Sequence, residues 1–227
     1  ASDEYCVYTR TSTQSNTFHR NKFKPFGIFK TTGNEWKWTY NSRGIVKANQ
    51  ELDMGEFEIN GKKYRLIFAK SNLTKDGLAA NEYDYGDYFA WGATEPWYSS
   101  ATQTWKNDKP GGYKAANAPY YYNGKYTSGN TLEAADDAAR QILKGDWQIP
   151  TKEIWDKLFE SSKYEWTKTK KAEYNGYQVK SKKSETGTIF LPVAGEVNNS
   201  WPSCDGTYGS YWSGTAKSNS SAYSLYL

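Results

Sequence analysis

The sequence predicts an α+β fold with short antiparallel strands, two helices and long loops. Strand-like segments come first, two amphipathic helical segments follow, and strand-like segments return at the end, which is an α+β order. Asn-Gly pairs lie between alternating runs, which is typical of antiparallel hairpins. The apolar content lies in 10 Trp, 20 Tyr and 9 Phe more than in aliphatic residues, which suits short strands and long loops.

The length predicts one main domain, because 227 residues bury one sizeable core but hardly two. We place this domain at residues 51–227. Residues 1–50 form a β-rich N-terminal lead-in, in which three short segments (CVYTRTSTQ, FKPFGIFK and EWKWTYN) have strand-like character.

The first clear unit of the main domain is a hairpin. Asn60-Gly61 separates two alternating runs, and we expect strands at 56–59 and 63–69. A strand-like aromatic run follows at 83–97. Residues 98–130 show no period, so we expect a long excursion there, with a small hairpin in PYYYNGKY.

Two helices are predicted next. In the first, over 130–145, Asn130 or Thr131 caps the start and Gly145 ends the helix. Acidic side chains in its first half complement the helix dipole. The expected buried stripe consists of Leu132, Ala135, Ala139 and Ile142.

The second helix starts after Pro150, with Thr151 as its cap. Its expected apolar stripe consists of Ile154, Trp155, Leu158 and Phe159. An Asn-Gly turn at Asn175-Gly176 then leads into strands.

The last forty residues contain two strand-like segments, at 188–194 and 221–227. Residues 196–220 between them are mostly Asn, Ser, Gly, Asp, Thr, Tyr and Trp. We therefore expect a long display loop that two buried strands hold at its ends. Such loops on rigid scaffolds are where binding residues concentrate.

Charge and hydropathy exclude two classes of partner. The net charge of +4 is mild, and no zinc-finger spacing, RNP-like motif or basic helix is present, so we expect no nucleic-acid partner. No apolar run approaches the roughly 18–20 residues that span a bilayer, so we expect no membrane span. No signal peptide is present, and the sequence starts at Ala1 without Met, which fits a mature or trimmed form.

The two cysteines, Cys6 and Cys204, lie near opposite ends of the sequence. They either pair across the fold or stay as two separate thiols, and the sequence alone leaves both alternatives open.

Several segments together resemble one family: YGDYFAWGATEP at 85–96, DDAARQILKGDWQIPTKEIWDKL at 136–158, NGYQVKSK at 175–182, IFLPVAGE at 189–196 and YWSGT at 211–215. In order and spacing they are similar to the Fibrobacter succinogenes major paralogous domain of Bacteroidetes surface proteins, over residues 56–227. The usual Gly-Leu-Ser opening of the family is replaced here by YRLIFAKSNL.

That family resembles the C-type lectin-like fold, which formylglycine-generating enzymes and retroelement-diversified variable proteins also share. The resemblance implies a C-type lectin-like domain with paired terminal strands, two helices and a long loop region on one face. It also implies an extracellular or cell-surface location, with a phage-borne protein as a further option.

The sequence predicts that the protein is not an enzyme and binds no cofactor. The single histidine, His19, lies in a basic polar segment without a partner that the sequence can place beside it. Serine nucleophile elbows, phosphate loops and paired cysteine ligands are absent. Formylglycine-generating enzymes use cooperating cysteines near their C-terminal region, where this sequence has only Cys204.

We also expect no metal site. Glu196, Asn198, Asn199 and Asp205 carry oxygen atoms of the kind that calcium prefers. The Glu-Pro-Asn and Trp-Asn-Asp signatures of calcium-binding lectins of this fold are missing, however. Capping or dipole complementarity accounts for Asp136 and Asp137.

Recognition of a protein or glycan remains as the predicted function. Flat aromatic rings lie between short hydrogen-bonding side chains in the display loop, a mixture that sugars and protein surfaces both select. The bland alternative is an ordinary polar loop shaped by turn geometry. The candidate ligand-binding residues are Asn198, Asn199, Trp201, Asp205, Thr207, Tyr208, Ser210, Tyr211 and Asn219, while Trp212 is assigned to the core.

The sequence thus predicts a non-enzymatic binding module, surface-displayed or secreted, that uses its C-terminal region. Adenine-directed retroelement diversification would leave the same residue bias, so a variable protein fits. The alternative is a structural or adhesive tip subunit of a surface or phage assembly. An enzyme related to formylglycine-generating oxidases ranks last.

Overall fold

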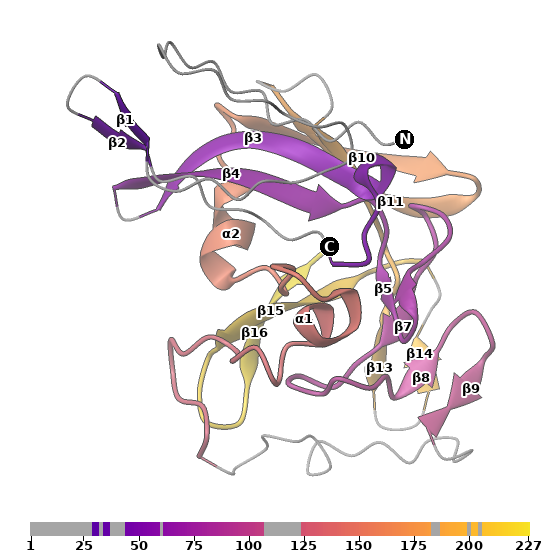
Figure 1. Cartoon of the computed structure of the whole chain (residues 1–227). Coiled ribbons are helices and arrows are strands. Elements are labelled where there is room, and N and C mark those ends of the chain that lie inside the picture. Colours follow the sequence, from indigo (N-terminus) through magenta and orange to yellow (C-terminus); the bar gives the residue numbers. More distant parts are fainter. Residues whose placement is uncertain are drawn as a thin grey trace. The chain divides into compact units, whose positions relative to one another are not determined.

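The fold is known from a computed structural model, which describes residues 29–31, 34–36, 44–59, 61–106, 124–182, 187–198, 201–203 and 206–227 (Figure 1). Contacts divide the chain into two units, Ala1–Ser42 and Arg43–Leu227. In the first unit, strands β1 (Phe29–Thr31) and β2 (Asn34–Trp36) pair antiparallel. His19 and Cys6 lie outside the described residues.

The second unit begins with a 3-10 turn and continues with short strands up to residue 105. These elements are η1 (Ala48–Gln50), β3 (Glu51–Ile59), β4 (Lys62–Ala69), β5 (Leu73–Thr74), β6 (Gly77–Leu78), β7 (Asp87–Tyr88), β8 (Tyr98–Ser99) and β9 (Thr104–Trp105).

Two short helices and further strands complete the unit. They are α1 (Ala138–Leu143), α2 (Lys152–Lys157), β10 (Tyr164–Lys171), β11 (Tyr174–Ser181), β12 (Thr188–Pro192), β13 (Glu196–Asn198), β14 (Trp201–Ser203), β15 (Ser210–Ala216) and β16 (Ala222–Tyr226).

The strands of the second unit form several small antiparallel sheets. Two of these sheets have three strands, in the orders β10-β11-β12 and β7-β8-β9. The others are two-stranded: β3-β4, β5-β6, β13-β14 and β15-β16. Pairing is antiparallel in each of them.

The predicted α+β, C-type lectin-like fold class is wrong. The chain is mostly β, with 41% strand and 11% helix, and its two helices are short. The residues next to the helices form turns or pair with strands, so they do not extend the helices. The outcome is a set of small antiparallel sheets around helical turns.

The main core lies where α2, the β3–β4 hairpin, the β10–β12 sheet and β16 meet. Its fully buried members include Leu158 of α2's C-terminal turn, Met54 of β3 and Val179 of β11. The Tyr164 hydroxyl donates a hydrogen bond to the Met54 carbonyl at 3.1 Å, which ties β10 to β3. A second cluster of Val46, Ala139 and Leu143 packs around α1.

The predicted first hairpin is confirmed. Ile59 lies opposite Lys62 in the β3–β4 register, so residues 60 and 61 form the connection. Gly61 has φ of 74°, the left-handed conformation for which glycine is suited. Asn60 itself lies outside the described residues. Strand β3 begins at Glu51, five residues before the expected start at 56.

The predicted turn at Asn175-Gly176 is wrong. Ala172 and Glu173 have positive φ of 44° and 71° and make the turn between β10 and β11, while Asn175 and Gly176 lie inside β11. A Cβ on Gly176 would lie 2.6 Å from the Leu191 carbonyl oxygen, so the glycine permits close approach of β12. The Asn175 side chain donates a hydrogen bond to the Gly206 carbonyl at 3.0 Å.

We therefore expect Gly176→Ala to destabilise the fold by about 1–3 kcal/mol, the usual cost of overpacking. The added methyl group would also lie 2.5 Å from Cζ of Phe190, so both the ring and the strand backbone must shift. Urea unfolding measures the change. The control is Thr167→Ala at an exposed position of the same sheet, where we expect a change below about 0.5 kcal/mol. Equal stability of both variants would contradict the close approach.

The first helix is shorter than predicted because its cap is Asp137, not Asn130 or Thr131. One carboxylate oxygen of Asp137 accepts from the Arg140 N–H at 3.0 Å, and the other accepts from the Ile149 N–H at 2.9 Å. Residues before the cap bond to β15 instead: the Leu132 N–H donates to the Gly214 carbonyl at 2.8 Å. Ala139 of the expected stripe is buried as predicted, but Ala135 is exposed, and the buried residues of α1 are Ala138, Ala139 and Leu143.

The buried cap predicts a pH effect on stability. Burial raises the pKa of Asp137 above its ordinary value of 3.8. The hydrogen bonds from the backbone N–H groups of Arg140 and Ile149 lower the pKa, but their effect is smaller. Because the folded-state pKa exceeds the unfolded one, the folded chain binds the proton more tightly between the two values. The contribution of Asp137 to the free energy of unfolding therefore decreases as the pH rises through this window.

Asp137→Asn removes this titration. On acidification from pH 7, the free energy of unfolding of the wild type should therefore increase relative to that of the variant. Urea unfolding of both proteins over that pH range provides the measurement. A difference that is independent of pH would contradict a raised pKa.

The predicted display loop at 196–220 is wrong as a description of structure. It contains the hairpin of β13 and β14, and then all of β15, whose residues 213–216 are buried. A parallel bridge joins Gly195 to Gly209, so the chain returns to the end of β12 before β15 begins. The flanking strands expected at 188–194 and 221–227 are confirmed as β12 and β16.

Two further predictions need correction. Within the aromatic run at 83–97, only Asp87–Tyr88 is a strand, because Gly86 and Gly92 with positive φ divide the run into turns. The expected excursion at 98–130 begins with β8 and β9, which pair with each other. Residues 107–123, with most of PYYYNGKY, lie outside the described residues.

Candidate functional site

A shallow groove lies between helix α2 and strand β16. Its volume is about 230 Å³, below the roughly 300–1,000 Å³ of pockets that enclose a drug-sized ligand. A groove of this size receives one ring or one side chain of a larger ligand. The side chains along it include Lys152, Asp156, Phe159, Tyr223, Ser224 and Tyr226.

The helical wall of the groove is fixed to β15. The Thr151 hydroxyl accepts from the Ile154 N–H at 3.3 Å, which confirms the predicted cap of α2. The Lys152 N–H donates to the Thr215 hydroxyl at 3.1 Å, and Trp155 Nε1 donates to the Trp212 carbonyl at 3.3 Å. The wall is therefore held before any ligand arrives.

The first rim of the groove is Phe159, whose exposed fraction is 56%. Its ring lies parallel to that of Trp166, with centroids 4.7 Å apart and an interplanar angle of 1°. Trp166 Nε1 donates to the Leu158 carbonyl at 2.6 Å. Phe159 was predicted to be buried, but α2 ends at Lys157, so the ring leaves the helical stripe and reaches the surface.

The second rim is Tyr226, whose exposed fraction is 68%. Its ring stacks on Tyr208, with centroids 5.8 Å apart and an angle of 21°. Side chains alternate along β16, so the burial of Leu225 turns Tyr226 outward. Each rim is thus an exposed ring that a second ring supports, which limits the entropy lost when a ligand contacts it.

The charged groups of the groove neutralise each other. Lys152 forms an ion pair with Asp156 one helical turn later, and its ammonium lies 5.5 Å from the ring centroid of Tyr223. The hydrogen bond to Asp156 raises the pKa of Lys152 above its ordinary value. General acid-base catalysis needs a pKa near the working pH, so this shift makes Lys152 a poorer base.

Three of the predicted site residues lie near the second rim. Tyr208 supports Tyr226, and Ser210 lies opposite Tyr226 in the β15–β16 register. Thr207 is exposed and immediately precedes Tyr208.

Tyr211 serves the scaffold. It points to the opposite face of β15 from Ser210, where its hydroxyl donates to the Pro192 carbonyl at 2.6 Å and accepts from Asn72 Nδ2 at 3.4 Å. Burial raises the pKa of this hydroxyl, so it stays protonated. Its ring packs near Trp155 in the core.

Among the described residues, none of the other predicted ones lines the groove. Asn198 and Trp201 face each other in the β13–β14 register. Asn199 and Asp205, like Cys204, lie outside the described residues. Asn219 lies in the turn that joins β15 to β16, and about 3.3 Å per residue along β15 places that turn roughly 20 Å from Ser210.

Trp212 was assigned to the core, and this prediction is wrong. Its exposed fraction is 40%, because the alternation that turns Tyr211 inward turns Trp212 outward. Its Nε1 donates to the Phe89 carbonyl at 2.9 Å, so the indole is anchored at the surface.

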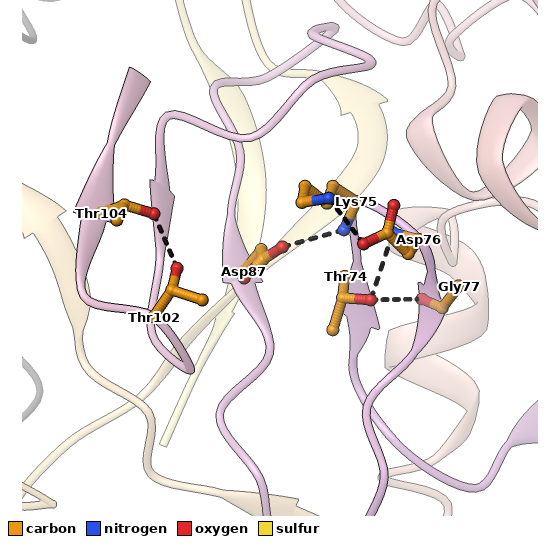
Figure 2. A network of polar contacts seen from close by, with 7 residues as sticks. All are labelled: Thr74, Lys75, Asp76, Gly77, Asp87, Thr102 and Thr104. Carbon is orange, nitrogen blue, oxygen red and sulfur yellow. Dashed lines mark hydrogen bonds and ion pairs between the residues drawn. The ribbon is translucent and has the colours of Figure 1, made fainter. Parts of the chain in front are cut away.

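A polar network surrounds Asp87 at a distance in sequence from the groove. Figure 2 shows Asp87 between the β5–β6 turn and the Thr102–Thr104 pair; its Oδ2 accepts from the Lys75 N–H at 2.8 Å. Oδ1 is buried without a hydrogen-bond partner among the described residues. One carboxylate falls short of the six to eight oxygen ligands that calcium takes.

No group of three His, Cys, Asp or Glu side chains that could hold a metal ion occurs among the described residues. The network of Figure 2 instead stabilises turns: the Thr74 hydroxyl donates to the Gly77 carbonyl at 3.2 Å, and the hydroxyl oxygens of Thr102 and Thr104 are 2.6 Å apart.

Comparison of the chain with protein-family models, with curated proteins and with solved structures gave no match. The resemblance to the Fibrobacter succinogenes major paralogous domain therefore stays a prediction. Within the described part of the chain, no helix has the length and apolar character needed to cross a membrane.

Sequence reasoning missed Phe159 and Tyr226 as site residues. A signal for Tyr226 exists in the sequence, since a strand that buries Leu225 must expose its neighbours. Phe159 follows directly after the fully buried Leu158. Whether its ring points to the core or to the solvent therefore depends on where the helix ends.

Proposed function

We propose that this chain is a non-enzymatic binding module that captures a protein or glycan ligand in the groove between α2 and β16. The observation that supports the proposal best is the pair of supported aromatic rims, Phe159 on Trp166 and Tyr226 on Tyr208. Isolated exposed hydrophobic residues are common on protein surfaces, but two ring pairs beside one groove form a recognition surface.

The chemistry of the groove favours binding over catalysis. Its cation is paired and carries a raised pKa, and its hydroxyl groups, on Tyr223, Ser224 and Tyr226, are suited to hydrogen bonding with a ligand. Aromatic rings and hydroxyl groups also dominate the binding loops of antibodies, for the same reason of contact area at low entropic cost.

Secretion or surface display, and diversification of the C-terminal region, remain predictions. If diversification operates, Tyr208 and Ser210 are the positions at which it would alter the groove, because both contact or face Tyr226. The alternative of a structural or adhesive tip subunit also remains a prediction.

A screen of immobilised peptides and glycans with the purified chain tests the proposal. The expected result is saturable binding to members of one class, with competition by the free ligand. Absence of saturable binding to either class would contradict the proposed function.

A further inference from the structure

The outer edge of strand β16 carries backbone groups that the fold does not use. Gly209 and Leu227 exchange both backbone hydrogen bonds, at 3.1 and 2.9 Å. Bonded and non-bonded pairs alternate along an antiparallel ladder, so Leu225 bonds to Tyr211, while Ser224 and Tyr226 form non-bonded pairs. The N–H and C=O groups of Ser224 and Tyr226 therefore point away from β15.

These groups have no hydrogen-bond partner among the described residues, because β16 pairs only with β15 there and no loop or side-chain bond reaches them. The same stretch lines the groove beside α2. The groove is thus bounded by a helix on one side and by an unpaired strand edge on the other.

Natural proteins usually protect such edges with lysine, proline or a bulge. The residues of this edge, AYSLY at 222–226, contain no charge and no proline, and the register is regular from Tyr226 to Ser224, with the register shift of the hairpin starting directly after the Trp212–Ser224 pair. The edge at Ser224 and Tyr226 is therefore flat and ready to pair.

We infer that the ligand of the groove is an extended polypeptide segment that adds a strand to the outer edge of β16. This inference rests on the proposed function and names its ligand class. Main-chain hydrogen bonds to Ser224 and Tyr226 would supply affinity, and every second side chain of the segment would face α2. A glycan lacks the regular alternation of N–H and C=O groups that this edge complements.

The charges and shape of the groove define the side chain that enters it. Lys152 and Asp156 neutralise each other, so an uncharged side chain complements the groove. Trp155 and Leu225 provide apolar surface, and Phe159 and Tyr226 flank it. An aromatic or large aliphatic side chain suits the volume of about 230 Å³.

A phage-displayed library of random heptapeptides serves as the probe, with a glycan array in parallel. The strongest peptide is synthesised with an ordinary backbone and with N-methyl groups at alternate residues. We expect one N-methylated register to lose at least about tenfold in affinity, because it removes the N–H groups that face β16.

Substitutions in the chain test the same contact from the other side. Ser224→Pro removes the outward N–H without removing a bond to β15, since proline is tolerated at outward positions of edge strands. We expect peptide binding to be about tenfold weaker in Ser224→Pro than in Ser224→Ala, because both variants lose the hydroxyl group but only the proline variant loses the N–H. Amide hydrogen exchange of the unaltered chain is the second readout, with slower exchange of Ser224 and Tyr226 on binding.

Peptide binding with unchanged exchange at both amides, or with equal affinity of the proline and alanine variants when both are folded, would overturn the strand addition and leave the binding module standing. Selective glycan binding without any selected peptide would do the same. Binding of neither probe would overturn both proposals.

Discussion

Truncation of the two groove rims, Phe159→Ala and Tyr226→Ala, should each weaken ligand binding at least about tenfold, and the double variant should bind hardly at all. Aromatic residues that a ligand buries can contribute about 2 kcal/mol or more to binding, as measured by replacement with alanine. Here each ring is exposed yet held by a second ring, so its contact area is available to a ligand without much ordering.

The variants should stay folded, because each loses a surface ring pair worth about 0.5–1.5 kcal/mol out of a total stability of about 5–15 kcal/mol. Titration calorimetry with the selected ligand measures the affinity. Tyr64→Ala is the matched control: Tyr64 is an exposed tyrosine of β4, and its replacement should leave affinity unchanged. Equal losses in control and rim variants would contradict the placement of the site.

The largest effect on stability is expected from Leu158→Ala, with a loss of about 2–5 kcal/mol in the free energy of unfolding. Leu158 is fully buried at the point where α2, β3, β10 and β11 meet. The truncated side chain leaves a cavity. The four surrounding elements cannot move inward to fill it, because hairpins hold their backbones in place.

The neighbouring residue provides the control for this prediction. Phe159→Ala removes more atoms than Leu158→Ala, but from an exposed ring, and should lower the free energy of unfolding by only about 1 kcal/mol. Urea unfolding at one pH compares the two. A greater loss for Phe159→Ala than for Leu158→Ala would show that the core is not centred on Leu158.

Local chemistry predicted some elements of this fold and could not predict others. Asn60-Gly61 and Asn175-Gly176 carry the same turn signal, yet only the first lies at a turn. The second pair lies in β11, where Gly176 allows β12 to approach and Asn175 bonds to Gly206. Both reasons depend on residues distant in sequence, which a turn signal does not contain.

The helices show the same difference. Thr151 caps α2 as predicted, because the bond to the Ile154 N–H is local. The cap of the first helix, Asp137, lies seven residues after Asn130 and six after Thr131, the two caps proposed for it, because β15 takes the backbone bonds of the preceding segment, with Thr131 bridged to Thr215. The segment of β15 is poor in aliphatic residues, which led us to expect a loop there. Its small residues Ser213 and Gly214 are nevertheless buried.

The candidate groove and the residues predicted from the sequence overlap only in part. Tyr208 and Ser210 lie at the groove's second rim, whereas Tyr211 points into the core. A step of one residue along a strand moves a side chain to the opposite face of the sheet, so composition alone does not decide which rings face outward. The α2 wall, with Phe159, comes from a part of the chain about fifty residues earlier.

Backbone amide chemical shifts of the isotope-labelled chain, followed during titration with its selected ligand, locate the binding site residue by residue. If the ligand binds in the groove, the largest changes fall on residues 152–159 and 223–226, with smaller ones at Tyr208 and Ser210. Changes concentrated instead on the β5–β9 segment, or on the turn around Asn219, would contradict the groove between α2 and β16 as the binding site.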